Sequence, residues 1–211
     1  MDSCDALVVN GYNSVAFLLV NRGFDVWCGN IRGNQYSLGY VGPLTEAGQW
    51  EIDLEDMSHD LKTFTDYVLK NSNYSQLHFI GFGFANSLAS IATSMNTTYY
   101  QAKWASWTAM QPTMQMIDYK KSPILSLLFD LQIIGGPKFF RETMNIYDFL
   151  SPNRLITLMI ESFCYMNPTI CKTLEQNWID SDPDLDNSTC VKTYFGHFPA
   201  GTPMKGLEHY G

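Results

Sequence analysis

The stretch HFIGFGFANSLASIA, His78–Ala92, decides how the middle of this chain folds. Its first half is apolar and rich in β-formers, which is typical of a buried strand. The glycines Gly81 and Gly83 then mark a tight turn, and Asn86–Met95 continues with the pattern of a helix. The sequence therefore predicts a strand, a sharp turn and a helix in direct succession.

A strand, turn and helix in this order form a nucleophile elbow when the turn carries Gly-x-Ser-x-Gly, whose serine attacks an ester. Acyl transfer needs an activated hydroxyl beside a base. The five positions here are Gly81, Phe82, Gly83, Phe84 and Ala85, so the tip of the turn is a glycine. The sequence predicts a degenerate elbow and no catalytic residue.

Ser87 is the alternative nucleophile, because it is the serine that follows the turn most closely. It lies four residues past Gly83, about one helical turn inward. Its hydroxyl is therefore expected to point away from a cleft at the tip. We interpret Ser87 as a surface or core serine on a helix.

Composition places the 211-residue chain among globular proteins with one domain, since 45% of its residues are hydrophobic and 16% are charged. The formal net charge of −8 argues against nucleic acid as a partner, because phosphate binding needs a basic face. No stretch reaches the roughly 18 apolar residues of a membrane span. The first residues, MDSCDALVVNGYNS, carry acids where a signal peptide carries Lys or Arg, so no signal peptide is predicted and the compartment stays open.

Cysteines and sequons bear on that compartment. The chain has five cysteines, so at least one thiol stays unpaired unless another chain supplies a partner. Cys164 and Cys171 are close enough in sequence to form a disulfide that closes a local loop, and a reduced pair fits the sequence equally well. Three sequons, at Asn73, Asn96 and Asn187, would be glycosylated only in a secretory compartment.

No cofactor or metal is predicted. The turn is not a dinucleotide fingerprint, because Asn86 stands where the third glycine is required. The cysteines form no C-x-x-C pair, so zinc is unsupported. The run IDSDPDLDNST indicates a solvated acidic loop, with a weak calcium site as the alternative. Its alternating aspartates are Asp180, Asp182, Asp184 and Asp186.

The fold class predicted from periodicity is α/β. Asp53 opens an amphipathic helix with apolar residues at a 4-3-4 spacing, and three β-rich runs surround it in the chain. Strands alternating with helices imply a parallel sheet with crossover helices. The expected strands are Phe24–Asn30, Gln76–Phe82 and Lys103–Met110. From Pro112 onward the chain reads as short helices, among them a methionine-bearing apolar stretch that fits a lipid-facing cap or ordinary core.

Five blocks of this sequence, in order, resemble the acid lipases, the gastric and lysosomal group of α/β-hydrolases. The elbow block stands where that family has LHYVGHSQGTT, so the family's serine falls on Gly83 and its His, Gln and second Gly are replaced as well. The blocks are NSVAFLLVNRGFDVWCGNIRGNQYS (13–37), WEIDLEDMSHDL (50–61), QLHFIGFGFANS (76–87), GPKFF (136–140) and GHFPAGTPMKGLEHY (196–210).

The resemblance implies a partial α/β-hydrolase core over 1–111, a helical cap or lid over 112–190, and a segment over 191–211 that returns to the core. It also implies an esterase in which a serine, an aspartate and a histidine hydrolyse the ester, under a cap that covers an apolar cleft. The family's oxyanion-hole loop precedes the part that MDSCDALVVNG resembles, and its acid and base follow the cap. The chain is therefore expected to be truncated at both ends.

None of the four histidines fits the position of the family's base, and each is expected to be a packing or surface residue. They are His59, His78, His197 and His209.

Two functions follow from the sequence. The first is a non-catalytic acid-lipase-like protein, or pseudoenzyme, kept as a structural, interaction or lipid-holding component. Another protein chain would cover its open sheet edges, and lipid or an acyl chain would lie under its cap. The second is a section of a lipid ester hydrolase, acting on triacylglycerols or cholesteryl esters, whose missing parts lie on another chain or were lost from the gene model. The family suggests a secreted or lysosomal location.

Overall fold

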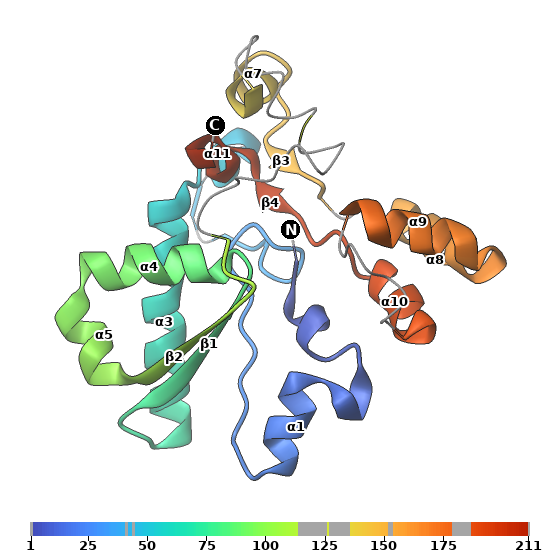
Figure 1. The fold of residues 1–211 in the computed structure, drawn as a ribbon. Coiled ribbons are helices and arrows are strands. Elements are labelled where there is room, and N and C mark those ends of the chain that lie inside the picture. Colours follow the sequence, from blue (N-terminus) through green and yellow to red (C-terminus); the bar gives the residue numbers. More distant parts are fainter. Residues whose placement is uncertain are drawn as a thin grey trace.

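The computed structural model describes residues 2–40, 42–43, 45–113, 126, 136–151, 154–178 and 187–210. Within these ranges the chain is mixed helix and strand with a small parallel sheet. The α/β part, residues 54–110, lies on the left of Figure 1, and three helices of the later sequence gather on the right. None of the described helices is both long and apolar enough to cross a membrane.

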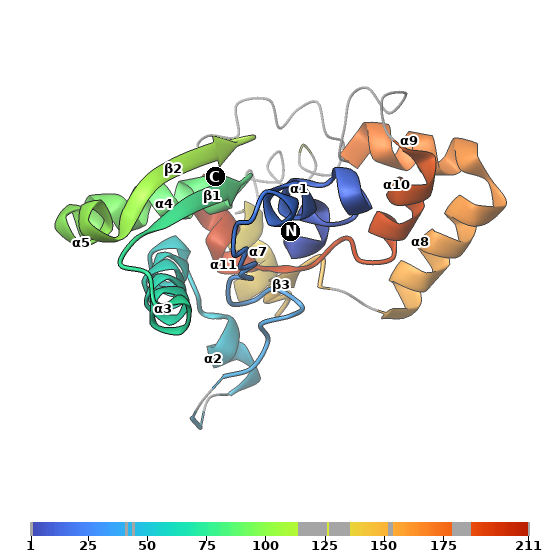
Figure 2. The same cartoon turned by 90° about the horizontal axis from the view of Figure 1, so that it is seen from below.

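The sheet consists of β1 (Leu77–Phe82) and β2 (Trp104–Met110), which pair in parallel with Phe79 opposite Trp107 and Phe82 opposite Met110. The crossover between them contains α4 (Ala85–Met95) and α5 (Thr97–Lys103). Figures 1 and 2 both show β1 and β2 side by side, with α4 and α5 next to them. The predicted strands Gln76–Phe82 and Lys103–Met110 are confirmed to within a residue.

The longest helix, α3 (Leu54–Ser72), begins at a capping box. The Asp53 carboxylate accepts from Asp56 N (3.0 Å), and the Asp56 carboxylate accepts from Asp53 N (3.2 Å). Its apolar stripe, which includes Met57 and Leu61, is buried against α4. The predicted amphipathic helix is confirmed.

Aromatic rings fill the core between these elements. The Phe79 and Trp104 rings stack with centroids 4.3 Å apart, and Tyr100 lies against Trp104 at 4.5 Å. The Trp104 indole N–H donates to Thr65 Oγ1 (3.0 Å), so the one polar atom of the ring is satisfied inside the core.

The predicted strand Phe24–Asn30 is wrong, because the segment joins no sheet. It follows α1 (Val15–Asn21) and runs beside the α/β part, where the Cys4–Cys28 disulfide ties it to the N-terminal 3₁₀ helix η1 (Cys4–Leu7). Its side chains are mostly exposed, whereas a central parallel strand is buried on both faces. Without that burial, the apolar run forms no hydrogen-bond ladder with another described strand.

The later sequence forms α8 (Arg154–Met166), α9 (Pro168–Trp178) and α10 (Ser188–Phe195), which pack together. Their shared core holds the Cys164–Cys171 disulfide and the rings of α10 and the residues after it. In both views these three helices stand apart from β1 and β2.

Four short elements connect the two parts of the molecule. They are α7 (Gly136–Glu142), β3 (Asp148–Phe149), β4 (Thr202–Pro203) and α11 (Met204–Leu207). β3 and β4 pair antiparallel, and α7 packs beside α11. The remaining described elements are η2 (Gly11–Asn13), α2 (Glu46–Trp50) and η5 (Glu208–Tyr210).

Two expectations fall outside the described residues. One is the methionine-bearing apolar stretch, apart from Ser126, and the other is the acidic run with Asp180, Asp182, Asp184 and Asp186. The cap or core reading of the first and the loop or calcium reading of the second stay predictions.

Candidate functional site

The predicted elbow is a sharp turn between β1 and α4. Phe82 ends the strand, Gly83 has φ +53° and Ala85 begins the helix, with Phe84 as its N-cap residue. Gly83 N donates to the carbonyl oxygen of Met110 (2.9 Å), so the tip is tied to the end of β2. The structure therefore brings all five predicted elbow positions into one turn at the carboxyl edge of the sheet.

The tip has room for a side chain but carries no reactive group. A Cβ built on Gly83 would meet no heavy atom within 4 Å, so a side chain there would project into open space. Its left-handed φ is a conformation in which L-residues are strained and glycine is not. The backbone at Gly83 leaves room for a side chain, but glycine supplies none.

Asn86 holds this turn in place. Its side chain is fully buried, and Nδ2 donates to the carbonyl oxygens of Gly81 (3.1 Å) and Gly83 (3.1 Å). The same nitrogen donates to Met110 O (3.0 Å), and Oδ1 accepts from Trp107 Nε1 (3.0 Å). One side chain thereby joins the end of β1, the tip and β2, with every polar atom of its amide satisfied.

The close packing of Asn86 also explains Gly81. A Cβ on Gly81 would lie 2.3 Å from Asn86 Oδ1, a distance that no real pair of these atoms adopts. Sequence reasoning used Asn86 only to reject a dinucleotide motif and missed this structural role. The signal available in the sequence is a lone amide within an otherwise apolar turn and helix start.

Ser87 is buried on α4 and its Oγ donates to the carbonyl oxygen of Thr113. A hydroxyl that is buried and donates its hydrogen to a backbone carbonyl is engaged in holding structure, in agreement with the interpretation of Ser87 as a helix serine. A nucleophile would instead give that hydrogen to a base.

The four histidines are all exposed. His78 Nδ1 lies 2.8 Å from Ser106 Oγ on the neighbouring strand, and His197 Nδ1 lies 3.1 Å from the Tyr36 hydroxyl. His59 is on α3 and His209 is in η5. These places fit surface and packing residues.

A second polar cluster, which the sequence did not indicate, gathers at the N-terminal segment. The Asp5 carboxylate accepts from Ser3 Oγ (2.6 Å) and lies 3.8 Å from His197 Nδ1. Burial, together with hydrogen bonding to Asp5, raises the pKa of Tyr36 to about 12. The Ser3 hydroxyl donates to the carboxylate and not to the imidazole, so these groups do not form a nucleophile and base pair.

Next to this cluster, the Asp2 carboxylate and the Tyr194 phenol are hydrogen-bonded to each other. Burial raises the pKa of the Asp2 carboxyl, and burial together with the nearby Asp2 raises the pKa of the Tyr194 phenol. Residues more than 150 positions apart meet here, and no spacing in the sequence points to such a meeting.

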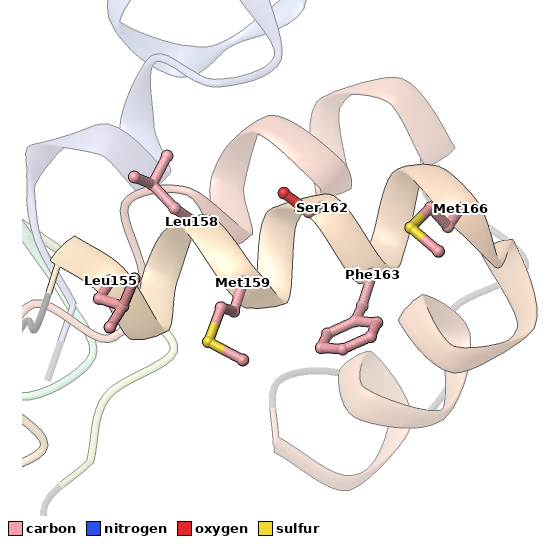
Figure 3. Close-up of a pocket in the computed structure, with 6 residues that line it drawn as sticks. All are labelled: Leu155, Leu158, Met159, Ser162, Phe163 and Met166. Atoms are coloured by element: carbon pink, nitrogen blue, oxygen red, sulfur yellow. The ribbon is translucent and has the colours of Figure 1, made fainter.

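The outer side of α8 is an apolar face. Its large side chains recur at helical spacing and are exposed, and they line a shallow groove of about 240 Å³ (Figure 3). Leu155 is 66% exposed and Met166 is 78% exposed. The α8 face consists of Leu155, Leu158, Met159, Ser162, Phe163 and Met166.

The described residues contain no group of three or more His, Cys, Asp or Glu side chains arranged to hold a metal ion.

Comparison with known proteins finds lipases among the relatives of this chain. The chain is 28% identical over 204 residues to gastric triacylglycerol lipase of Mus musculus and 28% identical over 210 residues to that of Homo sapiens. It is also 28% identical over 217 residues to Lipase 1 of Drosophila melanogaster. The chain is a relative of the acid lipases. No family model matches it.

These alignments cover most of this acid-lipase relative and only part of each protein that it matches. They include 94% of the chain and 49% of either gastric lipase, and 100% of the chain and 46% of Lipase 1. The chain thus spans about half the length of the curated relatives it matches. The degenerate elbow lies within the described part of this half.

Proposed function

We propose that this chain is a non-catalytic, acid-lipase-like protein. The observation that carries the proposal is the elbow, where Gly83 occupies the tip of an intact turn and supplies no nucleophile. The nearest hydroxyl along the chain, on Ser87, is buried and donates to a backbone carbonyl. An ester bound at the tip would find no side-chain oxygen on Gly83 to attack its carbonyl carbon.

The proposal includes a division of the chain. Residues 1–111 would form a partial α/β-hydrolase core, 112–190 a helical cap, and 191–211 a return segment to the core. The β1–elbow–α4 unit and the parallel β1–β2 pair support the first of these. The packing of α8, α9 and α10 apart from the sheet supports the second.

The alternative function is a section of a lipid ester hydrolase. It is favoured by the names of the relatives, which are lipases, among them gastric triacylglycerol lipases. Under this alternative the missing parts lie on another chain or were lost from the gene model. Another hydroxyl would then have to take the acyl group, and Ser87 is the candidate nearest to Gly83 along the chain.

Esterase assays test whether the chain itself is catalytic. The purified chain and its Ser87→Ala variant are given p-nitrophenyl butyrate, p-nitrophenyl palmitate and a fluorophosphonate probe, with a gastric lipase as the positive control. We expect no turnover above buffer and no covalent label on either protein. Turnover that Ser87→Ala abolishes, or a phosphonate adduct on any serine, would establish the hydrolase and overturn our proposal.

The Gly83→Ser variant tests whether the tip alone is the missing part. A serine oxygen would enter open space at a φ of +53°. We expect this variant to remain inactive, because no histidine of the described structure is placed as its base, and to lose about 1 kcal/mol of stability from the left-handed backbone. Esterase activity in Gly83→Ser would mean that the rest of the machinery is present.

Lipid holding is the role that the α8 face supports. We infer that an acyl chain lies along its groove, because a run of exposed Leu, Met and Phe side chains gains free energy when it is covered by hydrocarbon. Displacement of a fluorescent fatty acid measures this binding. We expect Phe163→Ser to weaken binding and Phe24→Ser to leave it unchanged, since Phe24 is as exposed (52% against 47%) but lies far along the chain from α8. Equal effects of both changes would contradict the site.

A protein partner on the sheet is the further part of the proposal. β2 pairs with β1 alone among the described strands, and most side chains along it are exposed. We infer that another chain covers this edge. Sedimentation of the protein purified from its native source would give a complex larger than the 24.0 kDa chain, and a strictly monomeric species would contradict the inference.

A further inference from the structure

The segment Phe24–Asn30, which joins no sheet, is anchored along α3. The Trp27 ring meets the Tyr67 ring edge to face, with centroids 5.9 Å apart. Gly29 lies so close to the Phe64 ring that a Cβ on this glycine would be 2.9 Å from it. Because Tyr67 and Phe64 both belong to α3, the segment follows this helix over successive turns.

The far end of the segment is tied to the N-terminal residues. Cys28 is joined to Cys4 by a disulfide, and the Asn30 side chain accepts from Cys4 N (3.0 Å) through Oδ1. The segment is therefore fixed in place without belonging to a sheet, and a partner that binds it has little chain entropy to remove.

The backbone of this anchored segment offers hydrogen bonds that nothing in the described part of the chain uses. The N–H and C=O groups of residues 25–28 have no hydrogen-bond partner among the described residues. The neighbouring side chains are apolar and open to solvent, with Phe24 52% and Trp27 38% exposed. A fixed row of free donors and acceptors flanked by apolar side chains is a template for strand pairing.

β1 presents a second such row. Among the described strands it pairs with β2 alone, so the N–H and C=O groups of every second residue point away from that ladder. Phe24–Asn30 passes near β1 in both Figure 1 and Figure 2, and in Figure 1 both rise alongside α3. Two rows of unused backbone groups thus lie near each other in the α/β layer without forming a ladder with one another.

We propose that another polypeptide inserts an extended, apolar strand beside β1, so that its backbone pairs both with β1 and with Phe24–Asn30. The complementarity is one of partial charges, because alternating N–H and C=O groups are matched by the same groups of a second extended backbone. The insertion continues an interface that already exists, since the β1–β2 ladder would extend through the new strand to Phe24–Asn30.

Hydrocarbon fits this place less well than a peptide does. It would cover Phe24 and Trp27, but it has no donor or acceptor for the free backbone groups. The α8 face differs in this respect, because a helix satisfies its own backbone and presents only side chains. Strands with a neighbour on each edge of a covered sheet are apolar on both faces, so we expect a strand rich in Val, Ile and Leu.

This inference deepens the proposed role as an interaction component, on which it rests for the existence of a partner chain. The place is different, because the partner proposed above covers β2, whereas the inserted strand lies against β1.

The test is amide hydrogen exchange on the whole chain, measured by mass spectrometry before and after addition of the peptide acetyl-Lys-Val-Ile-Val-Leu-Val-Ile-Lys-amide. In the free monomer we expect residues 25–28 to exchange as fast as an unstructured chain. The peptide should slow exchange at least about tenfold both there and in β1. Leu38 and Gly39, which are also exposed, are the internal control and should not change.

A second peptide separates strand pairing from adhesion of apolar or cationic side chains. It has the same side chains and charge, but N-methyl groups on every second residue remove the donors along one edge. We expect it to protect at most one of the two segments, because pairing with both needs both edges. Equal protection of both segments by the two peptides would overturn the proposal.

The remaining outcomes are equally decisive. No protection by the first peptide, or slow exchange of residues 25–28 in the free monomer, would overturn the proposal. Protection that accompanies dimer formation without peptide would assign the place to a second copy, and protection by palmitate would assign it to hydrocarbon, so either result also overturns it. Esterase activity of the chain would contradict the non-catalytic function and would leave all of these exchange results unchanged.

Discussion

At the scale of single residues, the turn after β1 depends on Asn86. Its fully buried amide is hydrogen-bonded to three carbonyl oxygens and one indole N–H, and these groups lose that partner if the side chain is removed. Buried polar groups that lose their partners retain their full desolvation penalty. The shape of the degenerate elbow therefore rests on a residue outside its five positions.

We predict that Asn86→Leu lowers the free energy of unfolding by about 3 kcal/mol, since several buried groups lose partners at once. Urea unfolding followed by circular dichroism measures the change. The control is Asn71→Leu, because Asn71 also donates from a helix to a backbone carbonyl (2.7 Å) but is exposed, and its loss should stay within about 0.5 kcal/mol. Equal losses in the two variants would contradict the role of Asn86.

The N-cap of α3 gives a prediction that depends on pH. The hydrogen bond from Asp56 N, with help from Lys205, lowers the pKa of the Asp53 carboxyl. Because the pKa is lower in the folded state, this group stabilises the fold above its ordinary pKa. The contribution is lost as the pH falls through the lowered value.

We therefore expect Asp53→Ala to cost about 1 kcal/mol at neutral pH, and the difference from the unsubstituted chain to shrink below a pH of about 4. Asp53→Asn retains a capping oxygen without a charge, so its stability should vary less in the acid range. Urea unfolding at several pH values provides the comparison. A deficit of Asp53→Ala that stays constant down to low pH would show that the charge of Asp53 has no part in the cap.

At the scale of elements, the disulfides stabilise the two parts of the chain separately. Cys4–Cys28 closes a separation of 24 residues and holds the unpaired segment after α1, while Cys164–Cys171 closes a separation of 7 between α8 and α9. Cys190 is the free cysteine of the described structure. Because loop-closure entropy grows with loop length, the first should contribute more.

We predict one reactive thiol in the denatured, unreduced protein and five after reduction, as measured by titration with an aromatic disulfide reagent. The double change Cys4→Ser and Cys28→Ser should cost about 3 kcal/mol, and Cys164→Ser with Cys171→Ser about 2 kcal/mol. The Cys190→Ser variant is the control and should leave no thiol before reduction. A thiol that persists in Cys190→Ser would mean that one of the disulfides is absent.

At the scale of the whole molecule, Arg141 joins segments that are far apart in the sequence. From α7 its Nε donates to Glu208 Oε1 (2.6 Å) in η5, and its Nη1 donates to Glu51 Oε1 (2.6 Å) after α2. The Arg141 side chain is only 13% exposed, so water screens these charges less than at the surface. The planar guanidinium serves both carboxylates at once.

We predict that Arg141→Ala lowers stability by about 2 kcal/mol, because Glu208 is left partly buried without its partner. Arg141→Lys should recover only part of this, since an ammonium cannot reproduce the fork of donors. Lys62→Ala removes an exposed pair with Asp66 (2.6 Å) and should cost about 0.5 kcal/mol or less. Thermal unfolding of the three variants makes the comparison, and a loss in Lys62→Ala equal to that in Arg141→Ala would contradict the network.

The sequence by itself determined the local elements and the character of the turn. Apolar, β-rich runs indicated β1 and β2, and the helical pattern indicated α3 and α4, because these signals are visible in the residue order. The lack of a nucleophile at position 83 was also visible in the sequence, since a glycine has no side chain in any fold. The same reading failed for Phe24–Asn30, whose apolar residues look like a strand but stay outside the sheet.

Only the tertiary structure decided which distant groups meet. It placed Asn86 against Met110, His197 beside Tyr36 and Asp5, and Arg141 between two carboxylates. It also left the apolar stripe of α8 facing outward, where the residue pattern fits a buried helix as well. The physical reason is that periodicity records which side of an element is apolar, whereas the partner of that side depends on how elements far apart in the chain pack together.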